Sequence, residues 1–132
     1  MRFALFYLVC GIAAAFSHAF TDPTSSIPMV GASGAISGVL GAYLLLYPRA
    51  QVLVLIPLGF YTRPVYVPAA VVLGFWFLLQ LLSGTASLGH EGGGVAFFDH
   101  IAGFLAGILL VGPLKRPEVP WFAPAHSHSR SR

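Results

Sequence analysis

The sequence predicts an all-α membrane protein, a bundle of four transmembrane helices. Of its 132 residues, 57% are hydrophobic and only 8% are charged, and the mean hydropathy is +0.82. Soluble domains carry about 25% charged residues. The apolar residues also gather into four segments, each close to the roughly 20 residues that a helix needs to cross the hydrocarbon core. These segments are Phe3–Phe20, Gly31–Tyr47, Val65–Leu82 and Val95–Gly112.

The basic residues predict the orientation of these helices. All seven Lys and Arg precede the first segment, lie between the second and third, or follow the fourth. Cytoplasmic loops are enriched in Lys and Arg. We therefore expect a multi-pass protein with both termini in the cytoplasm. The basic residues are too scattered along the chain to indicate nucleic-acid binding, and no nucleic-acid partner is expected.

The first segment has a second interpretation, as a cleaved signal peptide. Arg2 precedes the apolar run, and Ser17-His18-Ala19 resembles a small-x-small cleavage site. The run is somewhat long for a signal core, and its alanine-rich middle is typical of a helix-packing surface. We favour a retained span. The single cysteine, Cys10, excludes a disulfide framework.

Two regions outside the spans are assigned from composition. Gln51–Pro57 is apolar but too short to cross the membrane, and we expect it at the interface or against the bundle. We divide the chain into a membrane domain, residues 1–113, and a polar cytoplasmic tail, residues 114–132. The tail is expected to be disordered, and its His126 and His128 are a much weaker indication of metal binding.

A candidate nucleophile lies where the second segment begins. Ser33 stands in the sequence Gly31-Ala32-Ser33-Gly34, after a loop rich in Pro, Thr and Ser. Small neighbours allow close approach to the hydroxyl, and the first turn of a helix offers backbone N–H groups and the positive dipole end. Such a position can stabilise negative charge on a carbonyl oxygen. Taken alone, the pattern is also that of an ordinary small-residue packing motif.

His100 supplies a candidate base. Both the second and the fourth segment are expected to run from outside to inside, so Ser33 and His100 lie at a similar shallow depth below the outer surface. An ionisable residue within a span is a functional candidate, and a Ser–His pair is the usual form of an activated serine. Small residues on both segments, Gly34 and Gly38 on one and Gly103 and Gly107 on the other, permit close helix packing.

The sequences 31–38, GASGAISG, and 98–107, FDHIAGFLAG, together resemble the rhomboid family of intramembrane serine proteases. The resemblance covers nearly the whole chain and includes Tyr47-Pro48-Arg49-Ala50. It implies a six-helix core of which this chain carries the third to sixth spans. It also implies Ser33 as nucleophile, His100 as general base, backbone support of the oxyanion at Gly31 and Gly34, and a mobile cap at residues 83–94. Helix packing at the site would involve Gly38, Gly103 and Gly107, and no metal or organic cofactor is implied.

The chain departs from the family pattern at several positions. The first two spans have no counterpart, and the His and Asn that the second span contributes to the oxyanion site are not matched by His18 or His90. Asparagine is absent from the chain altogether. Asp99 replaces a small residue, and because it points about 100° away from His100 on a helix, we do not expect it to orient the base. Ser37 stands where some relatives carry an aromatic residue.

These observations lead to one principal functional hypothesis and two alternatives. The principal hypothesis is an intramembrane serine endopeptidase that cleaves transmembrane segments of membrane proteins with a Ser33–His100 dyad. Without the side-chain donors of the missing spans, we expect the chain as printed to cleave poorly by itself. The first alternative is a rhomboid-like protein that binds membrane clients without cutting them. A small transporter subunit is less consistent with a single intramembrane carboxylate.

Overall fold

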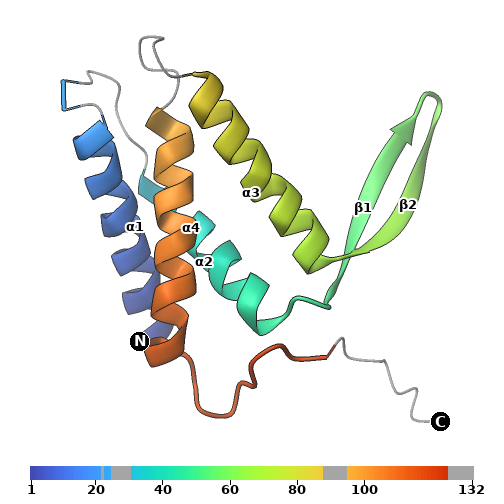
Figure 1. Cartoon of the computed structure of the whole chain (residues 1–132). Coiled ribbons are helices and arrows are strands. Elements are labelled where there is room, and N and C mark those ends of the chain that lie inside the picture. Colours follow the sequence, from blue (N-terminus) through green and yellow to red (C-terminus); the bar gives the residue numbers. More distant parts are fainter. Residues whose placement is uncertain (22, 25–30, 88–94, 125–132) are drawn as a thin grey trace.

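The computed structural model describes residues 1–21, 23–24, 31–87 and 95–124. These residues form four α-helices with a β-hairpin between the second and third (Figure 1). The helices are α1 Arg2–Thr21, α2 Gly31–Leu46, α3 Ala69–Ala86 and α4 Val95–Leu114, and the strands are β1 Gln51–Leu58 and β2 Tyr61–Pro68.

The helix α4 organises the bundle because it packs against each of the other three helices. Its contact with α2 is the most extensive, and α1 packs on both α2 and α4. In contrast, α3 lies against α4 and barely touches α2, so it diverges from the other helices at one end (Figure 1). A core cluster near the start of α1 and the end of α4 consists of Phe6, Cys10, Ala42 and Val111.

The large apolar side chains of the helices point mostly outward. Examples are Leu8, Ile12, Phe16, Phe75 and Leu109, all of which are exposed. Buried helix positions are instead dominated by small residues such as Ala14, Ala35 and Ala69. This inverted distribution is expected in a bilayer, where helices associate through small residues and present large apolar ones to lipid. The all-α membrane bundle predicted from the sequence is confirmed.

The lengths of the helices differ from the prediction at α2. Within the described residues, α1, α3 and Phe97–Leu114 of α4 are long and apolar enough to cross a membrane. The 16 residues of α2 rise only about 24 Å, which is less than the roughly 30 Å of the hydrocarbon core. The helix ends at Leu46 because Pro48 cannot continue it.

The start of α3 corrects the predicted third segment. Residues 65–68, assigned to a span, belong to β2, and the helix begins at Ala69 and extends to Ala86. The first amides of α3 have partners outside the helix, because Ala69 N–H donates to the Ala50 carbonyl at 2.8 Å and Ala70 N–H to the Pro48 carbonyl at 2.9 Å. Satisfying these N–H groups fixes the first turn of the helix.

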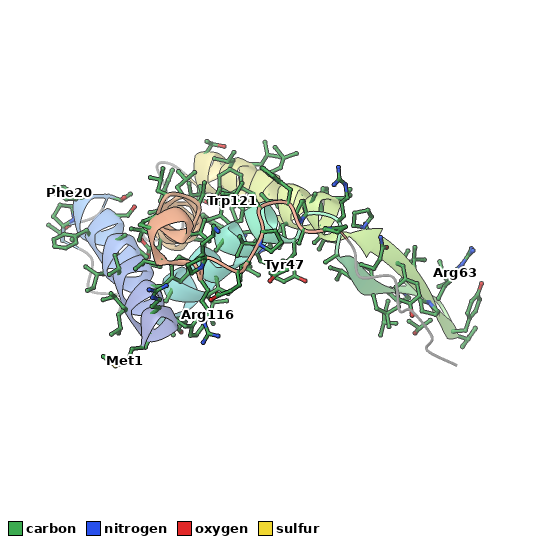
Figure 2. All side chains as sticks on the ribbon, turned by 90° about the horizontal axis from the view of Figure 1, so that it is seen from below. Met1, Phe20, Tyr47, Arg63, Arg116 and Trp121 are labelled. Carbon is green, nitrogen blue, oxygen red and sulfur yellow. The ribbon has the colours of Figure 1, made fainter. Side chains whose placement is uncertain are left out.

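The apolar stretch Gln51–Pro57 lies in a hairpin that the sequence analysis did not predict. Its partner strand runs antiparallel in a register from Gln51 opposite Pro68 to Leu58 opposite Tyr61. Gly59 opens the two-residue turn with φ of 69°, a left-handed conformation that favours glycine. The hairpin projects from the bundle on the α3 side (Figure 1). Arg63 on this hairpin lies far from Arg116 (Figure 2). Most of its side chains are exposed.

The segment after α4 folds back across the ends of α2 and α4. The N–H groups of Phe122 and Ala123 donate to the carbonyls of Leu45 and Leu46 at 3.1 and 2.7 Å. The Ala123 side chain is buried. This part of the predicted tail therefore contacts the membrane domain. His126 and His128 lie outside the described residues.

Candidate functional site

The candidate nucleophile Ser33 lies in the first turn of α2 and is exposed. Its carbonyl oxygen accepts a hydrogen bond of 2.9 Å from the Ser37 hydroxyl. Ser37 is 2% exposed, so its hydroxyl is buried in the helix packing and bound to the backbone one turn earlier. Of the two serines in this motif, Ser33 is therefore the one whose position suits attack on a substrate.

The candidate base His100 lies in the second turn of α4 and is partly buried. Its Nδ1 is 2.8 Å from Oε1 of Gln80 on α3. Because an amide oxygen only accepts hydrogen bonds, the imidazole proton in this contact is on Nδ1. The neutral ring then carries its lone pair on Nε2, which is the form that a general base requires.

One aromatic ring of α3, that of Trp76, lies beside this histidine. Trp76, one helical turn before Gln80, lies 6.1 Å from the His100 ring centroid, and also 5.8 Å from that of Phe104. Phe77 stacks on Phe104 at 4.7 Å. Some relatives carry an aromatic residue at the position of Ser37. In this structure the aromatic neighbour of His100 is Trp76 of α3.

Glycines bring the α2 and α4 backbones into direct contact beside these two residues. A Cβ atom built on Gly103 would overlap the carbonyl oxygen of Gly34, and one built on Gly107 would overlap that of Gly38. A Cβ on Gly34 would lie 3.7 Å from the Asp99 carbonyl. The turn of α2 that carries Ser33 therefore abuts the turn of α4 that carries His100.

The other glycines of the motif have different surroundings. A Cβ on Gly38 would also overlap the buried Cys10 side chain, so this residue is in contact with both α1 and α4. A Cβ on Gly31 would meet nothing within 4 Å. Packing therefore does not demand glycine at the first position of α2, whereas it does at Gly34 and Gly38.

Asp99 contacts α1 and turns away from the candidate base. Its Oδ2 is 3.0 Å from Nδ1 of His18, and its residue is 4% exposed. Its other oxygen, Oδ1, is buried without a hydrogen-bond partner among the described residues. This geometry agrees with the expectation that Asp99 does not orient His100. It also gives His18 a role that the sequence analysis did not assign, as the link between α1 and α4.

Three residues near the candidate site were missed by the sequence analysis, namely Gln80, Trp76 and His18. Gln80 had a usable signal, because it is a polar residue in an otherwise apolar run, Ala69–Leu82. Trp76 had none, since an aromatic residue in a span is equally common on a lipid-facing surface. Of the predicted cap at residues 83–94, residues 83–86 belong to α3. Residues 88–94, with His90, lie outside the described residues.

Comparison with known proteins bears on the whole chain. The family model of the Rhomboid domain matches residues 1–117, which include all four helices and the hairpin. No curated protein and no solved structure matches the chain. The match covers far more than half of the sequence. It agrees with a bundle whose helices bury small residues and expose large apolar ones. The chain is an integral membrane protein and belongs to the rhomboid family.

Proposed function

We propose that this protein is an intramembrane serine endopeptidase in which Ser33 and His100 form the catalytic dyad. The observation that carries the proposal is the meeting of the α2 and α4 turns at Gly34 and Gly103, together with the hydrogen bond from His100 Nδ1 to Gln80. The first brings the two elements together. The second holds the imidazole in the tautomer whose Nε2 can accept a proton.

In the proposed reaction, the Ser33 hydroxyl attacks a peptide carbonyl while His100 Nε2 takes the hydroxyl proton. The histidine then passes this proton to the leaving amine, and an acyl-enzyme forms on Ser33. Water, deprotonated by the same histidine, hydrolyses the ester and restores the serine. Gln80 accepts from Nδ1–H throughout, so it stabilises the imidazolium that exists between the two proton transfers.

The negative charge on the substrate carbonyl needs donors, and we place them at the start of α2. The helix begins at Gly31, so the positive end of its dipole lies beside Ser33. Backbone N–H groups around Gly31 and Gly34 are the proposed source of hydrogen bonds to the oxyanion. Losing one such donor in other enzymes costs about 10²–10³ in rate.

The proposed substrates are transmembrane segments of other membrane proteins, which reach the site from the surrounding bilayer. In the proposed orientation both termini are cytoplasmic and the dyad lies near the outer face. All Lys and Arg then lie on the cytoplasmic side. Cleavage is proposed where small or helix-breaking residues expose the substrate peptide bond, because an intact helix keeps its backbone groups paired.

The test is labelling of the full chain by a fluorophosphonate probe, alongside cleavage of a reporter with one transmembrane helix in liposomes. Ser33→Ala is expected to abolish both signals. Ser37→Ala is the matched control, because it removes a hydroxyl from the same helix, and labelling is expected to persist. Labelling of Ser33→Ala at the wild-type rate contradicts the assignment. Client binding by the wild-type chain without labelling of Ser33 favours the non-proteolytic alternative.

A further inference from the structure

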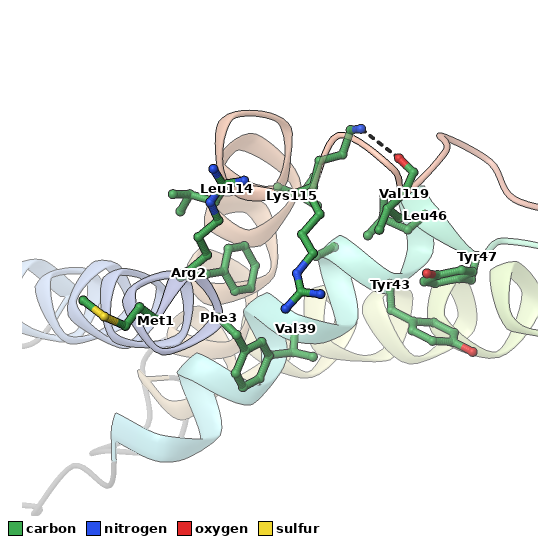
Figure 3. A pocket seen from close by; sticks show the side chains of 14 residues that line it. Met1, Arg2, Phe3, Val39, Tyr43, Leu46, Tyr47, Leu114, Lys115 and Val119 are labelled. Atoms are coloured by element: carbon green, nitrogen blue, oxygen red, sulfur yellow. Dashed lines mark hydrogen bonds between the residues drawn. The ribbon is translucent and has the colours of Figure 1, made fainter.

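A cavity lies at the end of the bundle opposite Ser33 and His100. Its volume is about 320 Å³, and its walls come from the start of α1, the second half of α2 and the end of α4 with the segment after it (Figure 3). This volume is at the lower end of the range for small-molecule sites, about 300–1,000 Å³. The dyad does not use this cavity.

All the charged side chains that line the cavity are basic. Arg2, Lys115 and Arg116 line it, and none of its lining residues is Asp or Glu. The Lys115 ammonium donates to the Val119 carbonyl at 2.8 Å (Figure 3). It also lies 5.1 Å from the Trp121 ring centroid. Arg2 and Arg116 are exposed residues at the rim. Two guanidinium groups in this position suit a phosphate, which they bind through paired N–H donors.

The carbonyl groups at the end of α2 do not repel an anion bound in this cavity. A helix C-terminus carries partial negative charge on its last carbonyls. In this structure the carbonyls of Leu45 and Leu46 are hydrogen-bonded by the N–H groups of Phe122 and Ala123. The fold-back of the chain after α4 therefore satisfies acceptors that would otherwise repel a negatively charged ligand.

The rest of the cavity wall is apolar. This wall favours a lipid over a soluble anion as the ligand. Its lining includes Phe3 and Phe6 of α1, Val39 and Ala42 of α2, and Val111 and Leu114 of α4. Phe3 is also exposed on the outer surface, so the apolar wall continues toward the bilayer. A cationic rim above an apolar wall at the end of membrane helices fits an amphiphile with an anionic head.

We propose that this cavity binds one anionic phospholipid from the leaflet on the Lys/Arg side of the membrane. The phosphate contacts Arg2 and Arg116 at the rim. The glycerol and the first part of an acyl chain lie against Phe3, Phe6 and Val39, and the remaining hydrocarbon stays in the bilayer. Basic pockets between helices on the cytoplasmic side are the general form of such lipid sites. This assignment is independent of proteolytic activity.

The experiment measures lipid retention by the full chain in detergent, by native mass spectrometry, during titration with dioleoylphosphatidylglycerol. The wild type is expected to retain one molecule, and dioleoylphosphatidylcholine is expected to bind far more weakly. Arg2→Gln combined with Arg116→Gln is expected to weaken phosphatidylglycerol retention about 30-fold, the factor for two charges near an anionic surface.

A charge-matched control separates the cavity from general basicity. Arg49→Gln combined with Arg63→Gln removes the same charge from residues that do not line the cavity. Its retention is expected to stay within twofold of the wild type, and glycerol 3-phosphate in excess is expected not to displace the lipid. Equal losses in the two double variants overturn the proposal. Equal binding of the zwitterionic lipid, or displacement by glycerol 3-phosphate, overturns it as well.

Discussion

Gln80 and His100 are joined by a hydrogen bond of 2.8 Å between Oε1 of the amide and Nδ1 of the imidazole. Gln80 lies on α3 and His100 on α4. The helix α3 packs mainly against α4 and has few contacts with the other helices. In a Ser–His–Asp triad, a carboxylate holds the corresponding nitrogen and fixes the tautomer. In the proposed dyad an amide takes that place, and it fixes the same tautomer without bringing a charge into the membrane.

Replacing Gln80 tests whether this hydrogen bond supports the proposed base. Gln80→Met has a similar length but no acceptor, so Nδ1–H loses its partner and the ring is no longer held in one tautomer. A hydrogen bond of this kind contributes about 0.5–1.5 kcal/mol. We therefore expect the rate of fluorophosphonate labelling at Ser33 to fall about tenfold.

The conservative variant Gln80→Glu keeps an acceptor oxygen at the same distance, and labelling is expected to stay closer to the wild-type rate than in Gln80→Met. Leu81→Met controls for a change at the next position of α3, where the side chain is exposed. If Gln80→Met and Gln80→Glu lose the same activity, the amide has only a packing role.

The contact between His18 and Asp99 predicts a non-additive effect on stability. His18→Leu leaves the buried Asp99 carboxyl without its partner, which typically costs about 1–3 kcal/mol. We expect a lower midpoint of thermal unfolding in detergent, measured by circular dichroism. The combined variant His18→Leu with Asp99→Leu removes both polar groups and is expected to recover most of the loss.

Asp99→Leu alone completes this cycle. The interaction between the two residues is the difference between the double variant and the sum of the single ones. Additive losses would mean that the two side chains do not stabilise one another, and α1 would then be held to α4 by apolar packing such as that of Phe6 and Val111.

Two glycines on different helices provide a paired test of the α2–α4 contact. Gly107→Ala places a Cβ against the Gly38 carbonyl, so the helices must separate. We expect a destabilisation of about 1–3 kcal/mol, as for other overpacked sites, and weaker labelling of Ser33. Gly74→Ala on α3 is the control, since a Cβ there meets nothing within 4 Å. Helix propensity then favours alanine by up to about 1 kcal/mol. Equal unfolding midpoints for the two variants would contradict the packing.

Several features of this protein follow from the sequence by itself. The number of helices and their approximate ends were predicted from the length of the apolar runs, because a bilayer requires about 20 apolar residues and satisfies backbone groups only within a helix. The glycines at positions 103 and 107 indicated a close helix contact. Their spacing of one turn places them on one face. These are local properties that a short stretch of chain determines without its neighbours.

The remaining features required the tertiary structure. Gln80 and His100 are 20 residues apart in sequence, and His18 and Asp99 are 81 apart. Whether such side chains meet depends on how each helix is rotated and at what angle it crosses its neighbour. The start of α3 at Ala69 likewise depends on carbonyls at Pro48 and Ala50. The basic cavity needs the ends of three helices in one place. A sequence pattern restricts the conformation of its own segment, whereas these contacts arise from packing between segments.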